Sequence, residues 1–214
     1  MKAIIGKKIG MTRVFDEKGM VIPVTLISVG ENVITQVKTA DTDGYEAAQV
    51  GMVENKKINK PLSGHLAKTK IKSRTFKEFH FSGLELGQKL DLTQFEEGEA
   101  VFAQNISKGK GWAGVVKRHH FNTGPRTHGS DNYRRPGSIG ATGPQRVIKG
   151  RRMAGQMGFE QVTQKNIKIV SIDIEKNILM VKGAIPGPNK STVYIWSNNA
   201  IKAKNEENTG ESNE

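Results

Sequence analysis

Short runs of apolar and β-branched residues, separated by turn residues, fill the first fifty positions of the chain. They predict strands at residues 4–5, 11–15, 20–29, 33–37 and 45–53, with a bend at residues 6–10 between the first two. Pro23 favours an edge or a bulge over a central strand position, because proline has no amide hydrogen to donate. Asp41-Thr42-Asp43-Gly44 is typical of a turn. Several strands joined by tight turns predict a small antiparallel β-barrel.

The rest of the chain continues mainly as β-structure with minor α-helix. Pro61 suits the first turn of a short helix at residues 61–70. Further strands are expected at residues 75–81, 87–92, 100–106, 167–174, 178–182 and 192–196, with Lys176-Asn177 as a hairpin turn. We therefore predict a discontinuous β-body made of residues 1–107 and 160–202. Residues 203–214 are polar and acidic and are expected to form a disordered tail.

The segment that interrupts the body, residues 108–158, differs from it in charge. It contains eleven Lys and Arg residues and one acidic residue, Asp131, and so carries +10 of the formal net charge of +12. It also contains eleven of the 24 glycines and no leucine. Such a segment buries too little apolar surface to fold by itself. We expect a long, irregular basic loop that is inserted in the barrel and folds against a polyanion.

Composition narrows the choice of that polyanion. A sequence pI near 9.8 indicates nucleic acid or an anionic membrane. No apolar run approaches the ~20 residues of a membrane span, and Lys7 and Lys8 interrupt an apolar start that is too short for a signal peptide. The lack of cysteine excludes disulfides and thiolate metal sites and fits a reducing cytoplasm. Nucleic acid is therefore the expected partner, and we expect no membrane and no cofactor.

One motif in the basic segment favours an alternative. Gly109, Gly111 and Gly114 match the dinucleotide-binding pattern G-x-G-x-x-G, and Asp131 follows near the spacing of a ribose-binding carboxylate. A nucleotide-dependent or RNA-modifying enzyme built on this loop is one interpretation. Against it, Thr123-Gly124-Pro125 cannot continue as the buried parallel strand of a βαβ unit. Glycines between lysines also let a backbone approach RNA phosphates closely, and we expect no enzyme.

His119, His120 and His128 form the histidine cluster of the chain. Without cysteine or a close carboxylate pair they make a poor zinc site. Only Asp131 is near enough in sequence to orient a catalytic base. We expect no metal and no catalytic residue, and we interpret these histidines as side chains that stack on nucleic acid, hydrogen-bond to it or simply lie at its surface.

Single arginines alternate with glycine, proline and small residues across the basic segment, unlike the pattern of an ordinary linker. Arginine binds phosphate in a bidentate manner and stacks on bases. Trp112 either stacks on a base or anchors the root of the loop to the barrel. The predicted RNA contacts are Lys7, Lys8, Lys108, Lys110, Trp112, Lys117, Arg118, His119, His120, Arg126, His128, Arg134, Arg135, Arg146, Lys149, Arg151 and Arg152.

Five motifs in order carry a resemblance to a known family. They are residues 6–13, Ser-Lys-Gly-Lys-Gly-Trp-Ala-Gly-Val-Val-Lys-Arg at 107–118, Thr-His-Gly at 127–129 with Arg-Pro-Gly-Ser-Ile-Gly at 135–140, Lys-Gly-Arg-Arg-Met-Ala-Gly-Gln-Met-Gly at 149–158, and residues 179–187. Over nearly its whole length the chain resembles the bacterial form of the large ribosomal subunit protein three family.

This resemblance implies a translation-protein-type β-barrel that binds 23S rRNA near its 3′ end and nucleates early subunit assembly. The basic loop would extend toward the peptidyl transferase centre without supplying catalysis. Implied partners are neighbouring large-subunit proteins in the cytoplasmic ribosome, with no homo-oligomer. Some bacterial members carry an N5-methylated glutamine at the position of Gln156, which implies a glutamine methyltransferase. A free RNA chaperone with no fixed site is a further alternative.

Overall fold

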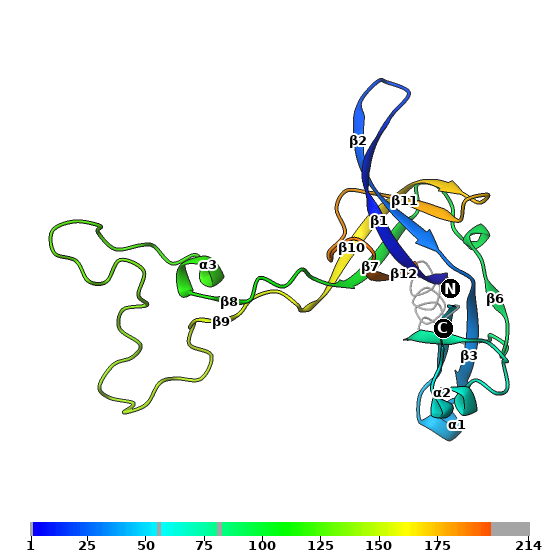
Figure 1. Ribbon diagram of the computed structural model, residues 1–214, viewed down its shortest axis with the longest axis horizontal. Helices are drawn as coiled ribbons and strands as arrows, with labels where there is room; N and C mark the ends of the chain where they lie inside the picture. The colour runs from blue at the N-terminus through cyan, green and yellow to red at the C-terminus, as the bar shows by residue number, and fades with distance from the viewer. Residues whose placement is uncertain (1, 55–56, 81–82, 198–214) are drawn as a thin grey trace, which may run out of the picture. The chain divides into compact units, whose positions relative to one another are not determined.

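The computed structural model describes residues 2–54, 57–80 and 83–197 (Figure 1). The described chain is mainly β-structure with few helices, which confirms the prediction of a mainly β protein with minor α-helix. It divides into two compact units. We call residues 1–106 with 161–214 the body, and residues 107–160 the extension. The predicted tail at residues 203–214 lies outside the described residues.

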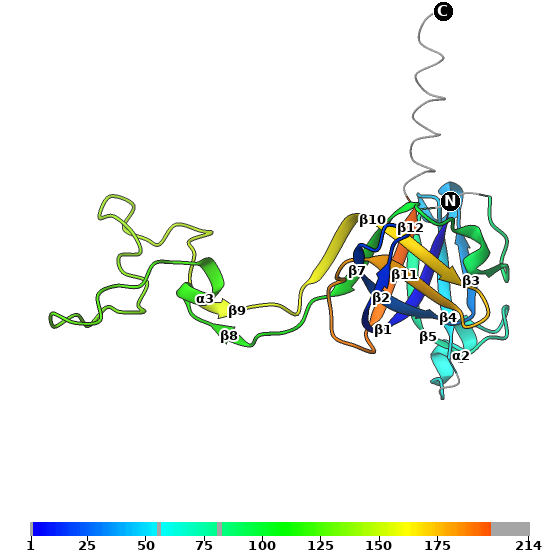
Figure 2. The same ribbon diagram turned by 90° about the horizontal axis from the view of Figure 1, so that it is seen from above.

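Six antiparallel strands of the body form a closed barrel (Figure 2). In barrel order they are β1 (Ala3–Phe15), β12 (Thr192–Ser197), β7 (Ala100–Ile106), β10 (Gln161–Asp173), β11 (Ile178–Lys182) and β2 (Val21–Val29). Alternate side chains point inward and form the first core, which includes Ile4, Ile27, Val101, Ala103, Ile169, Leu179, Val181, Val193 and Ile195. The barrel therefore closes by pairing the first and last described strands of the chain.

Four other strands form a second sheet in the order β5-β4-β3-β6. They are β3 (Asn32–Lys38), β4 (Ala47–Val53), β5 (Ser73–Phe79) and the short β6 (Lys89–Leu90). The expectation that all strands of the first fifty residues belong to one barrel is therefore wrong. The reason is visible in β1, where Ile4 packs in the barrel core while Ala3 and Ile5 pack in a second core with Ile34 and Val50 of the second sheet. A strand that is covered on both faces reads as a continuous apolar run.

A buried amide joins the two sheets. Asn32 is fully buried, and its Oδ1 accepts a hydrogen bond from the Ile5 amide at 3.0 Å while its Nδ2 donates to the Ile5 carbonyl at 3.0 Å and to the Gly30 carbonyl at 2.8 Å. The side chain thus satisfies a backbone group pair that would otherwise be buried without partners.

Several predicted boundaries need correction. Residues 6–10 are not a bend between two strands, because β1 runs through them with a bulge between Lys8 and Gly10 and pairs with β12 and β2. The helix expected at residues 61–70 ends early, as α2 (Lys60–His65), and Lys70 has a left-handed φ of 55°. The strand expected at residues 87–92 is shortened to β6 and followed by the 3-10 helix η1 (Leu92–Gln94).

Other predictions agree closely with the structure. β7 and β11 have the expected bounds, β12 contains the expected strand, and β10 covers the strand expected at residues 167–174 except for its last residue. Pro23 pairs with Arg13 of β1, and the register of β11 against β2 stops one residue away, at Val24. Proline therefore stands where β2 is an edge strand, as its missing donor requires. The expected turn at residues 41–44 is instead the short helix α1 (Ala40–Asp43), closed by Gly44 in the left-handed conformation.

Candidate RNA interface

The root of the extension is a paired ribbon and not an irregular loop. β8 (Trp112–Ala113) pairs with β9 (Gly155–Gln156), the Lys110 amide donates to the Met157 carbonyl at 2.8 Å, and the Met157 amide donates to the Gly111 carbonyl at 3.0 Å. The limbs approach so closely that a Cβ on Gly158, where φ is +71°, would lie 2.2 Å from the Lys108 carbonyl oxygen. The expectation of a segment without regular structure is therefore wrong at its root.

A short helix continues the ribbon. In α3 (Val115–His119), Val115 is buried, Arg118 donates from Nη1 to the Met153 carbonyl at 2.9 Å, and a ring nitrogen of His119 lies 3.0 Å from the same oxygen. Gly155 leaves room for this arrangement, since a Cβ there would lie 2.7 Å from Arg118 Nη1. Arg118 and His119 are half-buried, so within the extension they hold the return limb against the outgoing limb.

This geometry argues against a dinucleotide site at the G-x-G-x-x-G pattern. The glycines lie at an antiparallel ribbon followed by a five-residue helix, whereas the fingerprint belongs to a parallel βαβ unit. His120 and His128 are exposed residues with φ near 58°. Across residues 2–54, 57–80 and 83–197, no group of three or more His, Cys, Asp or Glu residues could hold a metal ion.

Beyond α3 the extension follows an irregular path that local contacts hold together (Figure 1). The Arg126 Nε donates to the Tyr133 hydroxyl at 2.6 Å, and its guanidinium lies 5.0 Å from the centre of that ring. The Gly124 amide donates to the Tyr133 carbonyl at 2.9 Å. Nearer the return limb, Arg151 Nη2 donates to the Ser138 carbonyl at 2.8 Å. Three of the predicted RNA-binding arginines, Arg118, Arg126 and Arg151, thus also shape the extension.

The other cations of the extension have no such partner among the residues that the structure describes. All described ion pairs lie in the body, and none joins a cation of the extension to a carboxylate. Eight exposed cations of the extension make no side-chain hydrogen bond to a described residue: Lys108, Lys110, Lys117, Arg134, Arg135, Arg146, Lys149 and Arg152. Uncompensated charge of one sign repels itself and attracts an external polyanion.

Two large aromatic side chains of the extension are exposed to solvent. Trp112 is 79% exposed and Phe159 is 72% exposed. An exposed indole has a face on which a base can stack, and the role of Trp112 as an RNA contact stays a prediction. Phe159 was not among the predicted contacts. An aromatic residue between Gly158 and Glu160, at the end of a glycine-rich segment, is the signal that would have identified it.

The two predicted contacts in the body have other roles. Lys8 is only 6% exposed, and its Nζ donates to the Ile185 carbonyl at 2.7 Å and to the Gly187 carbonyl at 3.4 Å. Its prediction as an RNA contact is therefore wrong, because a buried ammonium group bound to carbonyls cannot reach a phosphate. Lys7 pairs with Glu54 at 2.7 Å, which offsets its charge.

Gln156 lies exposed in β9, opposite Trp112. Its side-chain amide is therefore accessible within the extension, and its modification stays a prediction. No helix in the described part of the chain has the length and apolar character to span a membrane.

Comparison with known proteins identifies the family. The family model described as Ribosomal protein L3 matches residues 76–177. A large ribosomal subunit protein uL3 of Streptococcus pyogenes serotype M1 is 50% identical over 206 residues, which cover 94% of this chain and 98% of that protein. The uL3 of Streptococcus agalactiae serotype V is 48% identical over the same shares. The chain belongs to the uL3 family.

As a member of the uL3 family, the chain is a structural protein of the large ribosomal subunit and not an enzyme. Its place is the cytoplasmic ribosome, where it takes part in translation and associates with rRNA and other ribosomal proteins. The uL3 assignment and the antiparallel geometry of residues 109–114 together remove the enzyme interpretation.

Proposed function

We propose that the chain binds 23S rRNA near its 3′ end through the extension and thereby nucleates early assembly of the large subunit. The observation that carries the proposal is the set of eight exposed cations that make no side-chain hydrogen bond or ion pair within the described part of the chain. Electrostatic attraction to phosphates is the largest sequence-independent contribution to nucleic-acid affinity. Membership of the uL3 family, whose members are named as large ribosomal subunit proteins, supports the choice of an RNA of the large subunit.

Within this proposal the body, a translation-protein-type barrel with a second sheet, carries the extension and contacts neighbouring large-subunit proteins. The extension reaches toward the peptidyl transferase centre and supplies no catalytic group. Its role there is to fill space between RNA helices with arginine and glycine. Trp112 and Phe159 would stack on unpaired bases, which an exposed aromatic face permits.

Arg118 and His119 act mainly on the protein side of this interface. Their shared contact with the Met153 carbonyl fixes the two limbs, so that the cations of the tip are presented in a limited set of positions. Fewer residues of the extension then become ordered when RNA binds, so the entropic cost of RNA binding is lower.

Gln156 is the proposed site of N5-methylation by a glutamine methyltransferase. The supporting observation is that its side chain is exposed on β9 and so is accessible to an enzyme before assembly. A mass of one additional methyl group on the peptide that contains Gln156, in protein purified from its own host, tests this assignment. An unmodified peptide contradicts it.

A variant with fewer cations tests RNA binding. Arg134, Arg135 and Arg146 are changed together to glutamine, and the control changes the exposed body residues Lys165, Lys168 and Lys182 to glutamine. Both variants lose three positive charges. Binding to a 3′-terminal fragment of 23S rRNA is measured across a series of salt concentrations.

We expect the extension variant to bind more weakly and to lower the slope of log K against log salt by about 2–3, since each phosphate contact contributes roughly 0.7–0.9. The control variant should keep the slope of the unmodified chain. Equal slopes in the two variants would contradict the proposal. A chain that leaves large subunits at high salt during sedimentation would favour the free RNA chaperone instead.

A further inference from the structure

The body carries a second strongly basic region, which the charge of the extension conceals in the overall composition. Residues 57–77 contain seven Lys and Arg residues and no Asp or Glu. We call the side chains of this segment the 57–77 surface, and its cations are Lys57, Lys60, Lys68, Lys70, Lys72, Arg74 and Lys77. All except Lys77 are exposed. This is one continuous stretch of like charge on the folded body.

The charges of the 57–77 surface are not compensated within the described residues, whereas many others of the body are. Ion pairs join Lys2, Lys7, Lys38, Lys89 and Lys176 to carboxylates of the body. None of the seven cations of the 57–77 surface forms an ion pair with a carboxylate of the described residues. Because seven like charges in 21 residues repel one another, an external anion would relieve this repulsion.

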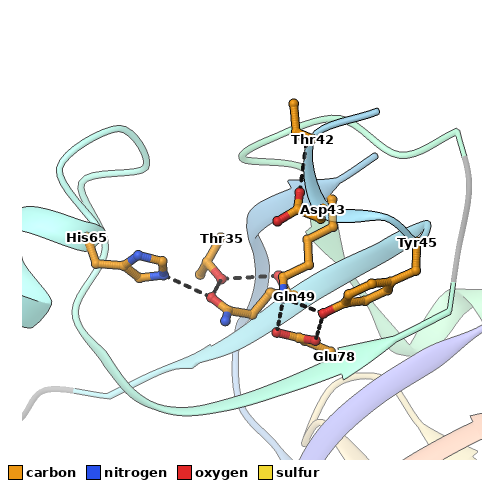
Figure 3. Close-up of polar contacts among 8 residues, drawn as sticks. Thr35, Thr42, Asp43, Tyr45, Gln49, His65 and Glu78 are labelled. Carbon is orange, nitrogen blue, oxygen red and sulfur yellow. Dashed lines mark hydrogen bonds and ion pairs between the residues drawn. The ribbon is translucent and has the colours of Figure 1, made fainter. Parts of the chain in front are cut away.

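The acidic residues that flank the segment are already engaged. Glu78 forms an ion pair with Lys38 at 2.9 Å and accepts a hydrogen bond from the Tyr45 hydroxyl at 3.0 Å (Figure 3). The bond from Lys38 is the main cause that holds the pKa of the Glu78 carboxyl below its ordinary value. On the other flank, Glu54 pairs with Lys7. Neither carboxylate neutralises the 57–77 surface.

The scaffold under this surface is fixed by packing and hydrogen bonds. Figure 3 shows the His65 ring, at the end of α2, turned toward the Gln49 side chain, with 3.0 Å between His65 Nε2 and Gln49 Oε1. Thr35 Oγ1 donates to the same oxygen at 2.7 Å. The His65 ring also meets Phe76 edge-on, and Leu66 is 1% exposed. The lysines thus project from a segment that is held against the second sheet.

We propose that the 57–77 surface is a second RNA-binding surface, which contacts phosphates and does not read bases. Six of its seven cations are lysine, which acts as a compact point charge, and its single arginine, Arg74, donates to the Lys57 carbonyl. No large hydrophobic side chain is exposed between residues 57 and 77. The extension differs, with seven arginines and the exposed Trp112 and Phe159.

The same composition argues for RNA over an acidic protein as the partner. Protein interfaces bury apolar and aromatic side chains at their centre, and no large hydrophobic side chain of the 57–77 surface is exposed. A polyphosphate backbone needs only closely spaced positive charges. The inference rests on the proposed function, because it assigns a second contact with the same class of ligand.

The test compares full-length variants. Lys60, Lys68 and Lys72 are changed together to glutamine, and the control again changes Lys165, Lys168 and Lys182 to glutamine. A third variant changes Lys60, Lys68 and Lys72 to arginine and keeps the charge. Binding to the 3′-terminal 23S rRNA fragment and to an unrelated RNA duplex of equal length is measured across salt concentrations, with thermal unfolding as a check of folding.

We expect the 57–77 glutamine variant to lose affinity for both RNAs by the same factor, so that the ratio of the two affinities is unchanged, and its salt slope to fall by roughly 2–3. The arginine variant should bind as the unmodified chain does. In the variant of Arg134, Arg135 and Arg146, the affinity for the 23S fragment should fall more than the affinity for the unrelated duplex, because arginine can contact bases.

Two results would overturn the inference. The first is that the 57–77 glutamine variant binds both RNAs as the control does. The second is that this variant keeps its RNA affinity but no longer associates with a neighbouring large-subunit protein. A failure of the proposed function is recognised separately, because the unmodified chain would then show no preference for the 23S fragment.

Discussion

The body and the extension use charge and burial in opposite ways. The body buries two apolar cores and pairs Lys2, Lys7, Lys38, Lys89 and Lys176 with its own carboxylates. The extension buries few side chains, such as Ala113 and Val115, and eight of its cations have no side-chain hydrogen bond or ion pair with a described residue. We therefore expect stability and RNA binding to depend on different residues, which substitutions should separate.

The 57–77 surface shows that the difference between paired and unpaired charge does not follow the boundary between the body and the extension. It belongs to the body, yet its charges are uncompensated like those of the extension. It differs from the extension in having lysine where the extension has mostly arginine. Three kinds of variant, in the core, the extension and the 57–77 surface, can therefore be compared directly.

The largest effect on stability is expected in the barrel core. Leu179 is fully buried, and Leu179→Ala should lower the free energy of unfolding by about 2–5 kcal/mol, because it removes apolar contacts and leaves a cavity. Urea unfolding followed by circular dichroism measures this loss. Ile148→Ala, at an exposed position of the extension, is the control and should change the value by no more than about 0.5 kcal/mol. Equal losses would mean that the extension shares the core's role in stability.

The next largest effect is expected at the amide between the two sheets. Asn32→Leu leaves the Ile5 amide and carbonyl buried without the partners that Asn32 provides, so we expect a loss of about 1–3 kcal/mol. Asn189→Ala, at an exposed site, should leave the unfolding midpoint unchanged. If both variants unfold at the same denaturant concentration, the Asn32 bridge does not stabilise the body.

A pair of glycines tests the root of the extension without touching the body. Gly158 and Gly150 both have positive φ, +71° and +82°, so alanine strains the backbone by about 1–2 kcal/mol at either site. Only Gly158→Ala also drives a Cβ against the Lys108 carbonyl. We expect faster hydrogen exchange of the Lys110 and Met157 amides and weaker rRNA binding in Gly158→Ala than in Gly150→Ala, with body unfolding unchanged in both. Identical behaviour would show that the paired root is unimportant.

The smallest effect concerns pH. Burial raises the pKa of the Glu99 carboxyl, but hydrogen bonds from Ser197 and Lys2 outweigh it, and the net pKa lies below the ordinary value. A group with a lowered pKa in the folded state stabilises the protein above its unfolded pKa and loses this contribution as pH falls through the folded pKa. The melting temperature of Glu99→Gln should therefore fall less between neutral and acidic pH than that of the unmodified chain. The difference should correspond to about 1 kcal/mol in the free energy of unfolding.

Glu175→Gln is the control for this measurement, since Glu175 is exposed. It should leave the pH dependence of melting as it is in the unmodified chain. A Glu99→Gln profile that is parallel to the unmodified one would contradict the assigned role of the Lys2–Glu99–Ser197 contacts.

The parts of the fold that local sequence determines were predictable. β7 and β11 were bounded by clear turn residues, such as Gly98 before β7 and Asn177 before β11. The parts that depend on distant partners were not. β1 continues through Gly6 and Gly10 because β12 and β2 pair with it on both sides, and β3 and β4 leave the barrel because their partners are β5 and β6.

The candidate site shows the same limit. Charge counting located the extension, but it could not show that Lys8 is buried against carbonyls of residues 185 and 187, nearly the whole chain away. Charge counting also could not show which arginines form hydrogen bonds within the protein. Arg118, for example, donates to the carbonyl of Met153, which lies 35 residues away in the sequence. Acidic residues elsewhere in the body offset the charge of the 57–77 surface in the total, so charge counting did not single out the segment as a whole.

The separation of stability from RNA binding is tested most directly by removing residues 108–158 and joining the limbs by a short Gly/Ser linker. The account predicts a chain that unfolds cooperatively at a temperature close to that of the full chain and does not sediment with large ribosomal subunits assembled in its presence. A deleted chain that joins large subunits as the full chain does, or that fails to fold, would contradict it.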